Sequence, residues 1–143
     1  MRHREFLRRF RRREGGQAIV EFAVILPVFL LMVLGMIDLA RAWNAKQVIT
    51  DAAREGARWG VVREPPVDAA FINGVIADAL NAAGFDASQA TITLTPADAA
   101  GARGTVFSVN VQYPYTFEFM GIFMSLVGGN TIQLESQIAM REE

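Results

Sequence analysis

The chain begins with an apolar run that is long enough to cross a membrane. No residue from Phe22 to Ile37 is charged or strongly polar, and the run extends back to Ala18 with Glu21 as its one interruption. An α-helix rises 1.5 Å per residue, so the segment 18–37 would span roughly 30 Å, the thickness of the hydrocarbon core of a bilayer. A small soluble domain rarely encloses such a helix. The pattern therefore predicts a single transmembrane helix over residues 17–40.

The helical periodicity continues beyond this span. From residue 36 to residue 60, apolar and small residues fall near one face and charged residues lie away from it. This predicts one helix of about 45 residues that ends at Glu64-Pro65-Pro66, because proline lacks the backbone N–H. The expected apolar face comprises Met36, Leu39, Trp43, Ile49, Ala53, Gly56, Ala57 and Gly60, and the expected polar positions are Asp38, Arg41, Asp51, Arg54, Glu55 and Arg58.

A second helix is expected over about residues 67–83, with Gly84 as its C-terminal cap. The pair Asn73-Gly74 is also typical of a hairpin turn, but the residues around it repeat with a period of 3.6. The apolar stripe of this helix consists of Ala70, Phe71, Ile72, Val75, Ile76, Ala79, Leu80 and Ala83.

After Phe85 the period changes to two, which is typical of strands. Three strands are expected, around 91–95, 105–117 and 131–140, and the small-residue loop 96–104 joins the first two. Short connections favour an antiparallel meander, and Pro114 indicates an edge position or a strand end. The fold class is therefore α+β, a long transmembrane helix extending into a small domain with a second helix and a three-stranded antiparallel sheet. The inward faces are Ile92 and Leu94; Phe107, Val109, Val111, Tyr113, Tyr115 and Phe117; and Ile132, Leu134, Ile138 and Met140.

Composition leaves little for catalysis. The 143 residues include no cysteine, which excludes thiolate metal sites and disulfides. The one histidine is His3, in the arginine-rich head, so histidine acid–base chemistry is not expected. A carboxylate pair would have to come from Asp86, Asp98, Glu118 or Glu135, whose spacing suggests none. We therefore expect no enzyme activity, no cofactor and no metal.

Positive charge is concentrated at the N-terminus. Residues 1–14 hold seven arginines against two glutamates, although the whole chain has a formal net charge of −1. A basic head could bind nucleic acid or anionic lipid, but beside a membrane span such residues usually set the topology. This predicts a cytoplasmic N-terminus, an external C-terminal region and no nucleic-acid partner.

Glu21 is the most informative single residue. A carboxylate in the middle of a bilayer costs about 2.5–3.5 kcal/mol, and less near the end of the span, where it reaches the headgroups. The sequence around it offers a sharper interpretation, since a basic leader ends in Gly16 and four residues later comes Glu21, followed by Phe22. This arrangement is typical of prepilin peptidase substrates, which are cut after the glycine. A cut there would leave Gln17 with a charged α-amine (pKa near 8) that a neighbouring subunit's Glu21 could pair with.

Further segments repeat the pattern of a known family. They are Gly16–Ala23, Leu26-Pro27, Gly35–Asp38 and Ala52–Arg58, and together they resemble the TadE family, the pilin-like proteins (pseudopilins or minor pilins) of the Tad/Flp branch of type IV pilus systems. The close resemblance covers about residues 15–60.

The resemblance implies a leader at 1–16 removed by a dedicated aspartyl prepilin peptidase, a span at 17–40 and an external domain at 41–143. It makes Gly16 and Gln17 the processing residues, and Glu21 and Phe22 assembly residues. It also implies a place in the bacterial inner membrane or the pilus, partnership with other pilin-like subunits, and a role in adherence or biofilm formation. A domain of this size beyond the helix favours a minor or priming subunit over the bulk pilin.

Other interpretations remain open. The chain could be an unprocessed single-pass envelope protein whose external domain binds a ligand or partner. Leu39-Ala40-Arg41-Ala42 resembles a signal-peptidase site that would release a domain starting at Trp43, although Asp38 fits that template poorly. Pro27 is expected to kink the span, and the small residues at 52–57 are expected to serve close packing. The apolar segment Phe119–Val127 is either a contact surface or core.

Overall fold

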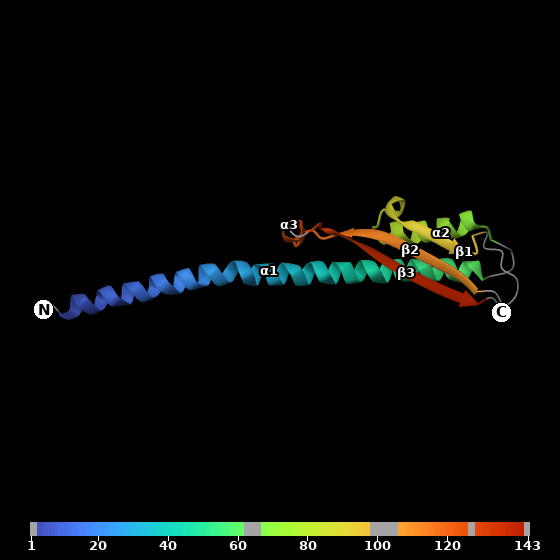
Figure 1. Cartoon of the computed structure of the whole chain (residues 1–143). Coiled ribbons are helices and arrows are strands. Elements are labelled where there is room, and N and C mark those ends of the chain that lie inside the picture. The colour runs from blue at the N-terminus through green and yellow to red at the C-terminus, as the bar shows by residue number, and fades with distance from the viewer. Residues whose placement is uncertain (1–2, 62–66, 98–105, 126–127, 142–143) are drawn as a thin grey trace.

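The computed structural model describes residues 3–61, 67–97, 106–125 and 128–141, with residues 3–15 and 122–123 described in their backbone only. The order of elements is α1 (His3–Gly60), α2 (Ala69–Ala82), a 3-10 turn η1 (Ala87–Gln89), β1 (Thr91–Thr95), β2 (Val106–Thr116), α3 (Gly121–Met124) and β3 (Thr131–Arg141). The N-terminal half of α1 projects alone, and the other elements gather along its C-terminal half (Figure 1). The predicted α+β fold is confirmed.

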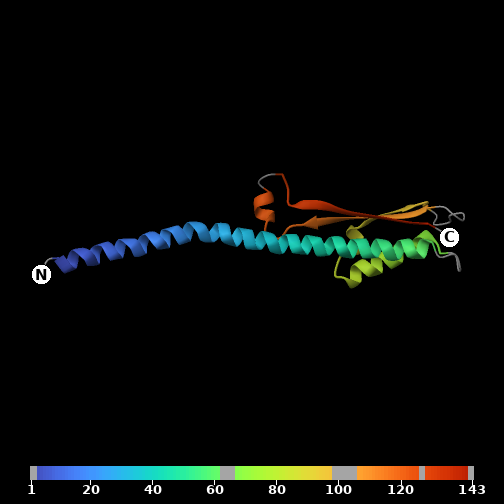
Figure 2. The same ribbon diagram turned by 90° about the horizontal axis from the view of Figure 1, so that it is seen from below.

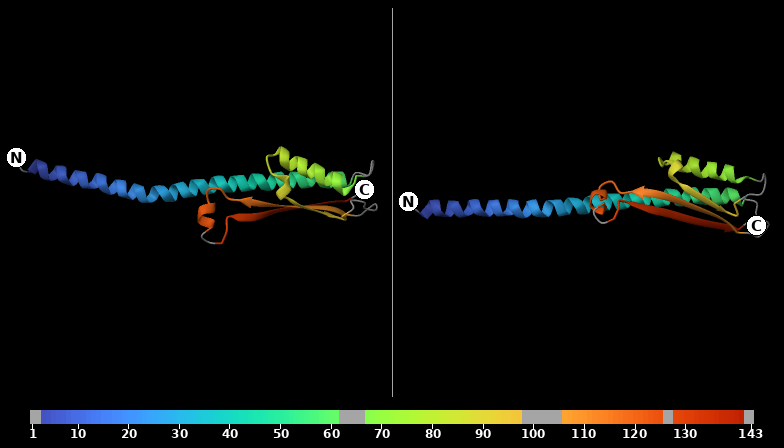
Figure 3. Two further views of the ribbon diagram at one scale, coloured as in Figure 1. Left: turned by 90° about the horizontal axis from the view of Figure 1, so that it is seen from above. Right: turned by 45° about the horizontal axis from the view of Figure 1, so that its top comes forward.

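Helix α1 is a continuous helix of 58 residues that contains Pro27. It bends gently within its N-terminal half, the half that holds this proline (Figure 3). A proline inside a helix removes one backbone hydrogen bond, so a bend there has a local cause. The helix ends at Gly60. Glu64-Pro65-Pro66, the expected stop, lies outside the described residues.

Helix α2 has a defined start and end. The side chain of Asp68 accepts a hydrogen bond from the backbone N–H of Phe71 at 2.7 Å, which caps the first turn. Ala83 is the C-cap, and Gly84 follows with φ +85°, the left-handed conformation that glycine adopts most easily. Its buried side chains are Ile72, Ile76 and Leu80. Asn73-Gly74 lies inside this helix, so the hairpin alternative is wrong.

The three strands form an antiparallel sheet in the order β1-β2-β3. Strand β1 pairs with residues 108–112 of β2, whereas β3 pairs with β2 along its whole length. Pro114 faces Gln133 of β3 and lies beyond the end of β1. A residue without an N–H is tolerated there because β2 has a single partner strand at that point. Pro114 belongs to the central strand, but at its position β2 has β3 on one side and no strand on the other. The predicted edge position is confirmed in this local sense.

The core lies around the C-terminal half of α1, with α2 on one side of it and the sheet on the other (Figures 2 and 3). Small residues make this close packing possible. A Cβ on Gly56 would lie 2.5 Å from the Cδ1 atom of Ile76, and a Cβ on Gly60 would overlap the ring of Phe107. The small residues at 52–57 serve packing, as predicted. The buried core is Ile49, Ala52, Ala53, Ala57, Ile72, Ile76, Leu80, Phe107, Val109, Val111 and Tyr113.

Over residues 36–43, the face of α1 that packs on the domain differs from the expected apolar face. Met36, Leu39 and Trp43 are exposed by 56%, 66% and 67%, whereas Asp38, expected at a polar position, is fully buried. The face that packs on the domain runs through Asp38, Ala42, Ala45, Ile49 and Ala52 or Ala53. The physical reason is that this part of the helix has two apolar environments beside it, the core of the domain and the lipid of the membrane. Hydrophobic side chains near a membrane span do not have to face the protein core.

Candidate functional site

The predicted processing and assembly residues lie on the projecting half of α1. Gly16, Gln17, Glu21 and Phe22 are all exposed, and an added Cβ on Gly16 would meet no atom within 4 Å. The structure brings two of them together, because the side-chain amide of Gln17 donates to the Glu21 carboxylate at 3.0 Å, one helical turn away. Among the residues that the structure describes, none of the domain covers them.

The bond between Gly16 and Gln17 lies inside the helix, preceded by a glycine pair at 15–16. Glycine is about 1 kcal/mol less favourable than alanine in a helix interior. The glycine pair therefore lowers the helix propensity of α1 next to this bond.

The apolar surface of the N-terminal half of α1 is not covered by the described part of the chain. Among the described residues, α1 is the one helix long and apolar enough to cross a membrane, and the most apolar part of it is entirely unburied. Its exposed side chains include Ile19, Phe22, Val24 and Val28, each more than 60% exposed. One long apolar N-terminal helix of this kind fits a single-pass membrane protein.

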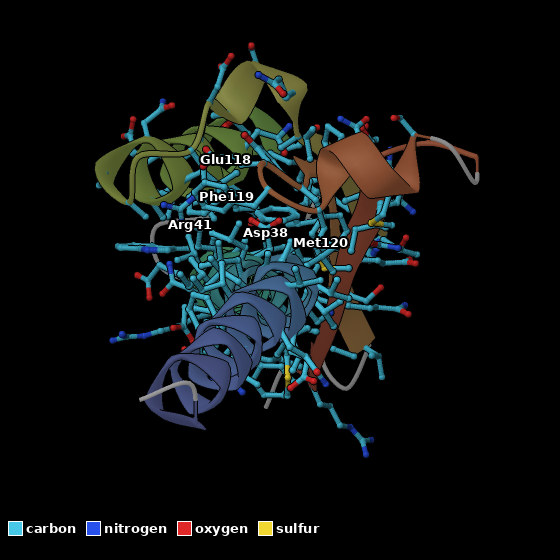
Figure 4. The ribbon with its side chains drawn as sticks, turned by 90° about the vertical axis from the view of Figure 1, so that its left-hand side faces the viewer. Asp38, Arg41, Glu118, Phe119 and Met120 are labelled. Atoms are coloured by element: carbon cyan, nitrogen blue, oxygen red, sulfur yellow. The ribbon has the colours of Figure 1, made fainter. Side chains whose placement is uncertain are left out.

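A second set of residues, which the sequence analysis did not identify, joins α1 to the segment that follows the C-terminal end of β2. Asp38 is fully buried, and its Oδ2 atom accepts hydrogen bonds from the backbone N–H groups of Phe119 at 2.9 Å and Met120 at 2.7 Å. Its Oδ1 atom is buried without a partner. In Figure 4 Asp38 lies between α1 and the segment that carries Phe119 and Met120. The Asp38 side chain fixes this segment against α1 because one of its oxygens accepts two adjacent backbone N–H groups.

Arg41 lies one turn further along the same helix. Its guanidinium pairs with the Glu118 carboxylate and stands 5.2 Å from the centre of the Phe119 ring, a cation–π geometry. Both side chains of the ion pair are about half exposed or more, so the pair orients the segment more than it stabilises the fold. We call Asp38, Arg41, Glu118, Phe119 and Met120 the Asp38 cluster (Figure 4).

The Asp38 cluster also affects Tyr115 on β2. Burial raises the pKa of the Tyr115 hydroxyl, and the negative charge of Asp38 raises it further. Arg41 acts in the opposite direction, and Glu118 adds a smaller rise.

The helical spacing of α1 could have identified Asp38 as a buried residue. Asp38 precedes the buried Ala42 and Ala45 by four and seven residues, which is the spacing of one helical face.

Polar contacts also hold β3 to α1. The Lys46 ammonium donates to the backbone carbonyl of Glu135, and the Ser136 hydroxyl donates to the Thr50 hydroxyl at 3.1 Å. On the other side of β3, the Asn110 amide donates to the Glu135 carboxylate at 2.6 Å. Hydrogen bonds from Asn110 and Gln112 hold the pKa of Glu135 below its ordinary value.

The carboxylates considered for catalysis have separate partners. Asp86 caps η1 through the Ser88 N–H at 3.0 Å, Glu118 pairs with Arg41, and Glu135 accepts from Asn110. Asp98 lies outside the described residues. Within the described part of the chain, no three histidine, cysteine, aspartate or glutamate side chains converge as a metal site would require.

Comparison with known proteins gives one match. Residues 16–58 match the family model described as TadE-like protein, and the resemblance drawn from the sequence is confirmed over this segment. The family is one of structural, pilin-like components associated with the Tad pilus, so the match indicates a component of that kind. No curated protein and no solved structure gives a significant match to the chain.

Proposed function

We propose that this protein is a minor, pilin-like subunit of a Tad-type pilus assembly system, and that a prepilin peptidase removes residues 1–16 by cutting after Gly16. The observation that carries the proposal is the extent of the family match, which begins at Gly16 and includes the whole apolar run and the packed half of α1. The exposure of the Gly16–Phe22 segment supports access by a membrane-embedded peptidase.

Glu21 and the new N-terminus form the proposed assembly contact. The Glu21 carboxylate already accepts from the Gln17 side chain, so both residues occupy one turn at the start of the processed helix. When processed helices pack side by side, the ammonium of Gln17 in one subunit pairs with Glu21 in its neighbour. A misaligned neighbour leaves the carboxylate unpaired in a medium of low dielectric constant, which is costly. The pair therefore sets the axial register between subunits, and the exposed Phe22 beside it packs between helices.

The proposed location follows from charge and hydropathy. Residues 17–40 cross the bacterial inner membrane, the arginine-rich leader faces the cytoplasm, and residues 41–143 form the external domain. The partners are the prepilin peptidase, other pilin-like subunits of the same system and membrane lipid. The external domain is large relative to the span, which favours a minor or priming role in pilus biogenesis, and through the pilus in adherence and biofilm formation.

Replacement of Glu21 tests the assembly contact. Glu21→Leu removes the charge and makes the span more apolar, so insertion into the membrane should be unchanged while pilus formation is lost. The measurement is membrane fractionation together with counting of surface pili in cells that carry the variant.

A matched control is Asp51→Asn, which removes an exposed carboxylate of the same helix outside the span. This variant should form pili normally. Normal pilus formation by Glu21→Leu would contradict the proposed contact.

A further inference from the structure

The connection between β2 and β3 is unusual in length and composition. Strand pairing ends at Thr116 and Thr131, so residues 117–130 form the connection, where hairpins usually need two to five residues. Eight of these fourteen residues are large and apolar, and Glu118 is the one charged residue. We call residues 117–130 the β2–β3 connection. Loops exposed to water seldom carry so many apolar side chains.

Backbone hydrogen bonds hold the described residues of the β2–β3 connection, 117–125 and 128–130, in place. The N–H of Phe117 donates to the carbonyl of Asn130 at 2.9 Å, which closes its base. Within it, the N–H groups of Met124 and Ser125 donate to the carbonyls of Met120 and Gly121, both at 2.9 Å. No described residue of the connection belongs to the hydrophobic core or packs against it. The described apolar side chains of the connection, Phe117, Phe119, Met120 and Met124, are therefore not explained by the core of the domain.

The Asp38 cluster fixes the level of the connection along α1. Asp38 holds the N–H groups of Phe119 and Met120, and the Sδ atom of Met120 lies 3.1 Å from the position that a Cβ on Gly35 would occupy. The connection is thus level with residues 35–38, the end of the apolar run 18–37. Figure 1 shows α3 at the end of the domain nearest the bare half of α1, and in Figure 2 α3 runs across the direction of α1.

On the opposite face of α1, the apolar surface continues beyond the level of residues 35–38, which indicates that the membrane boundary lies further along the helix. Met36, Leu39 and Trp43 form an exposed apolar stripe there, continuous with the lipid-facing surface of the span. Tryptophan is enriched at the membrane–water interface. Trp43 lies five residues beyond Asp38, about 7.5 Å further along the helix axis. If Trp43 marks the interface, the start of the β2–β3 connection is closer to the centre of the bilayer than Trp43.

We propose that residues 119–125 of the β2–β3 connection insert into the outer interfacial layer of the bilayer, with α3 in the membrane plane and the apolar side chains of Phe119, Met120 and Met124 in contact with acyl chains. This inference rests on the proposed single-pass membrane location. Arg41 and Glu118 then lie among the headgroups, where charged side chains are well solvated. Short elements that lie in the interface bind through buried apolar area in this way. The connection fixes the domain on the membrane surface before the subunit leaves the bilayer.

Single-cysteine spin labelling of the full chain in phospholipid vesicles tests this inference. The chain has no cysteine, so each variant carries one label. Met124→Cys and the nearly isosteric Ser125→Cys report on the connection. Val28→Cys reports on the span, and Val106→Cys is the matched control, an exposed valine at the other end of β2. The measurement compares collisions of each label with oxygen, which concentrates in lipid, and with a water-soluble nickel chelate.

We expect the oxygen-to-nickel ratio at residues 124 and 125 to exceed the ratio at residue 106 several-fold and to approach the ratio at residue 28. A water-like ratio at 124 and 125 with a lipid-like ratio at 28 would overturn this inference and leave the membrane location intact. A water-like ratio at 28 would overturn the membrane location as well. Low collision with both reagents at 124 and 125 would show that another protein surface covers the connection, and would also overturn the inference.

Discussion

At the scale of single residues, Asp38 has a structural role that its position in the sequence does not indicate. A carboxylate directly after an apolar run looks like the start of the solvent-exposed helix. In the structure it is fully buried and accepts two backbone N–H groups from residues 81 and 82 positions away. Sequence periodicity could place Asp38 on the same face as Ala42 and Ala45. It could not identify the hydrogen-bond partners of Asp38, because they are backbone N–H groups, which nearly every residue type carries.

Asp38→Ala should release the β2–β3 connection from α1. Each N–H left without an acceptor costs about 1–3 kcal/mol when buried, so the amides of Phe119 and Met120 should exchange with solvent much faster. Asp38→Asn retains an acceptor oxygen and should lose clearly less protection. Hydrogen exchange of the full chain in detergent measures both. Equal protection in the alanine variant and the unchanged protein would show that Asp38 does not hold this segment.

Glu135 should show a pH effect that depends on Asn110. Its folded-state pKa is lowered from 4.5, chiefly by the hydrogen bond from Asn110 and then by that from Gln112. Because this pKa is lowered by folding, the contact stabilises the fold fully at a pH above the pKa of Glu135 in the unfolded state. The stabilisation is lost as the pH falls through the pKa of Glu135 in the folded state. Asn110→Ala should raise the pKa of Glu135, measured by NMR titration of its side chain. An unchanged pKa would contradict this assignment.

At the scale of elements, glycine and alanine on α1 determine how closely the other elements approach. The residues between Ala52 and Gly60 let α2 and β2 contact the helix backbone. The sequence predicted this packing role because small residues at helical spacing permit close approach. It also predicted both helices and all three strands, since each has a clear period of 3.6 or 2.

Gly60→Ala should destabilise the domain, because the added methyl group overlaps three ring atoms of the buried Phe107. Overpacking of this kind typically costs about 1–3 kcal/mol. Gly74→Ala is the control, since an added Cβ on this α2 residue meets no atom within 4 Å. It should stabilise the fold by about 0.5–1 kcal/mol through helix propensity. Thermal unfolding of the full chain in detergent, followed by circular dichroism, should give opposite shifts, and a shift of the same sign would contradict the packing described.

At the scale of the whole molecule, the order of the elements was predictable, but the face of α1 that packs on the domain over residues 36–43 was not. The sequence located the apolar run, the second helix and the meander. It placed Met36, Leu39 and Trp43 on one apolar face with residues that are buried, because hydrophobicity alone does not distinguish a protein interior from lipid. For the same reason the sequence left residues 119–127 undecided between core and contact surface. The structure shows that the described residues among them lie outside the core.

The N-terminus of the native protein tests the central claim most directly, because the proposed Glu21 contact needs the free α-amine of Gln17, which a cut of the Gly16–Gln17 bond supplies. The measurement is the intact mass of the protein extracted from the membranes of its own host. Intact mass is preferable to stepwise degradation because an N-terminal glutamine can cyclise with loss of ammonia and block it. We predict a chain that starts at Gln17 and retains its α-amine. A chain that starts at Met1 or at Trp43, or a Gln17 chain lacking one ammonia, would contradict the account.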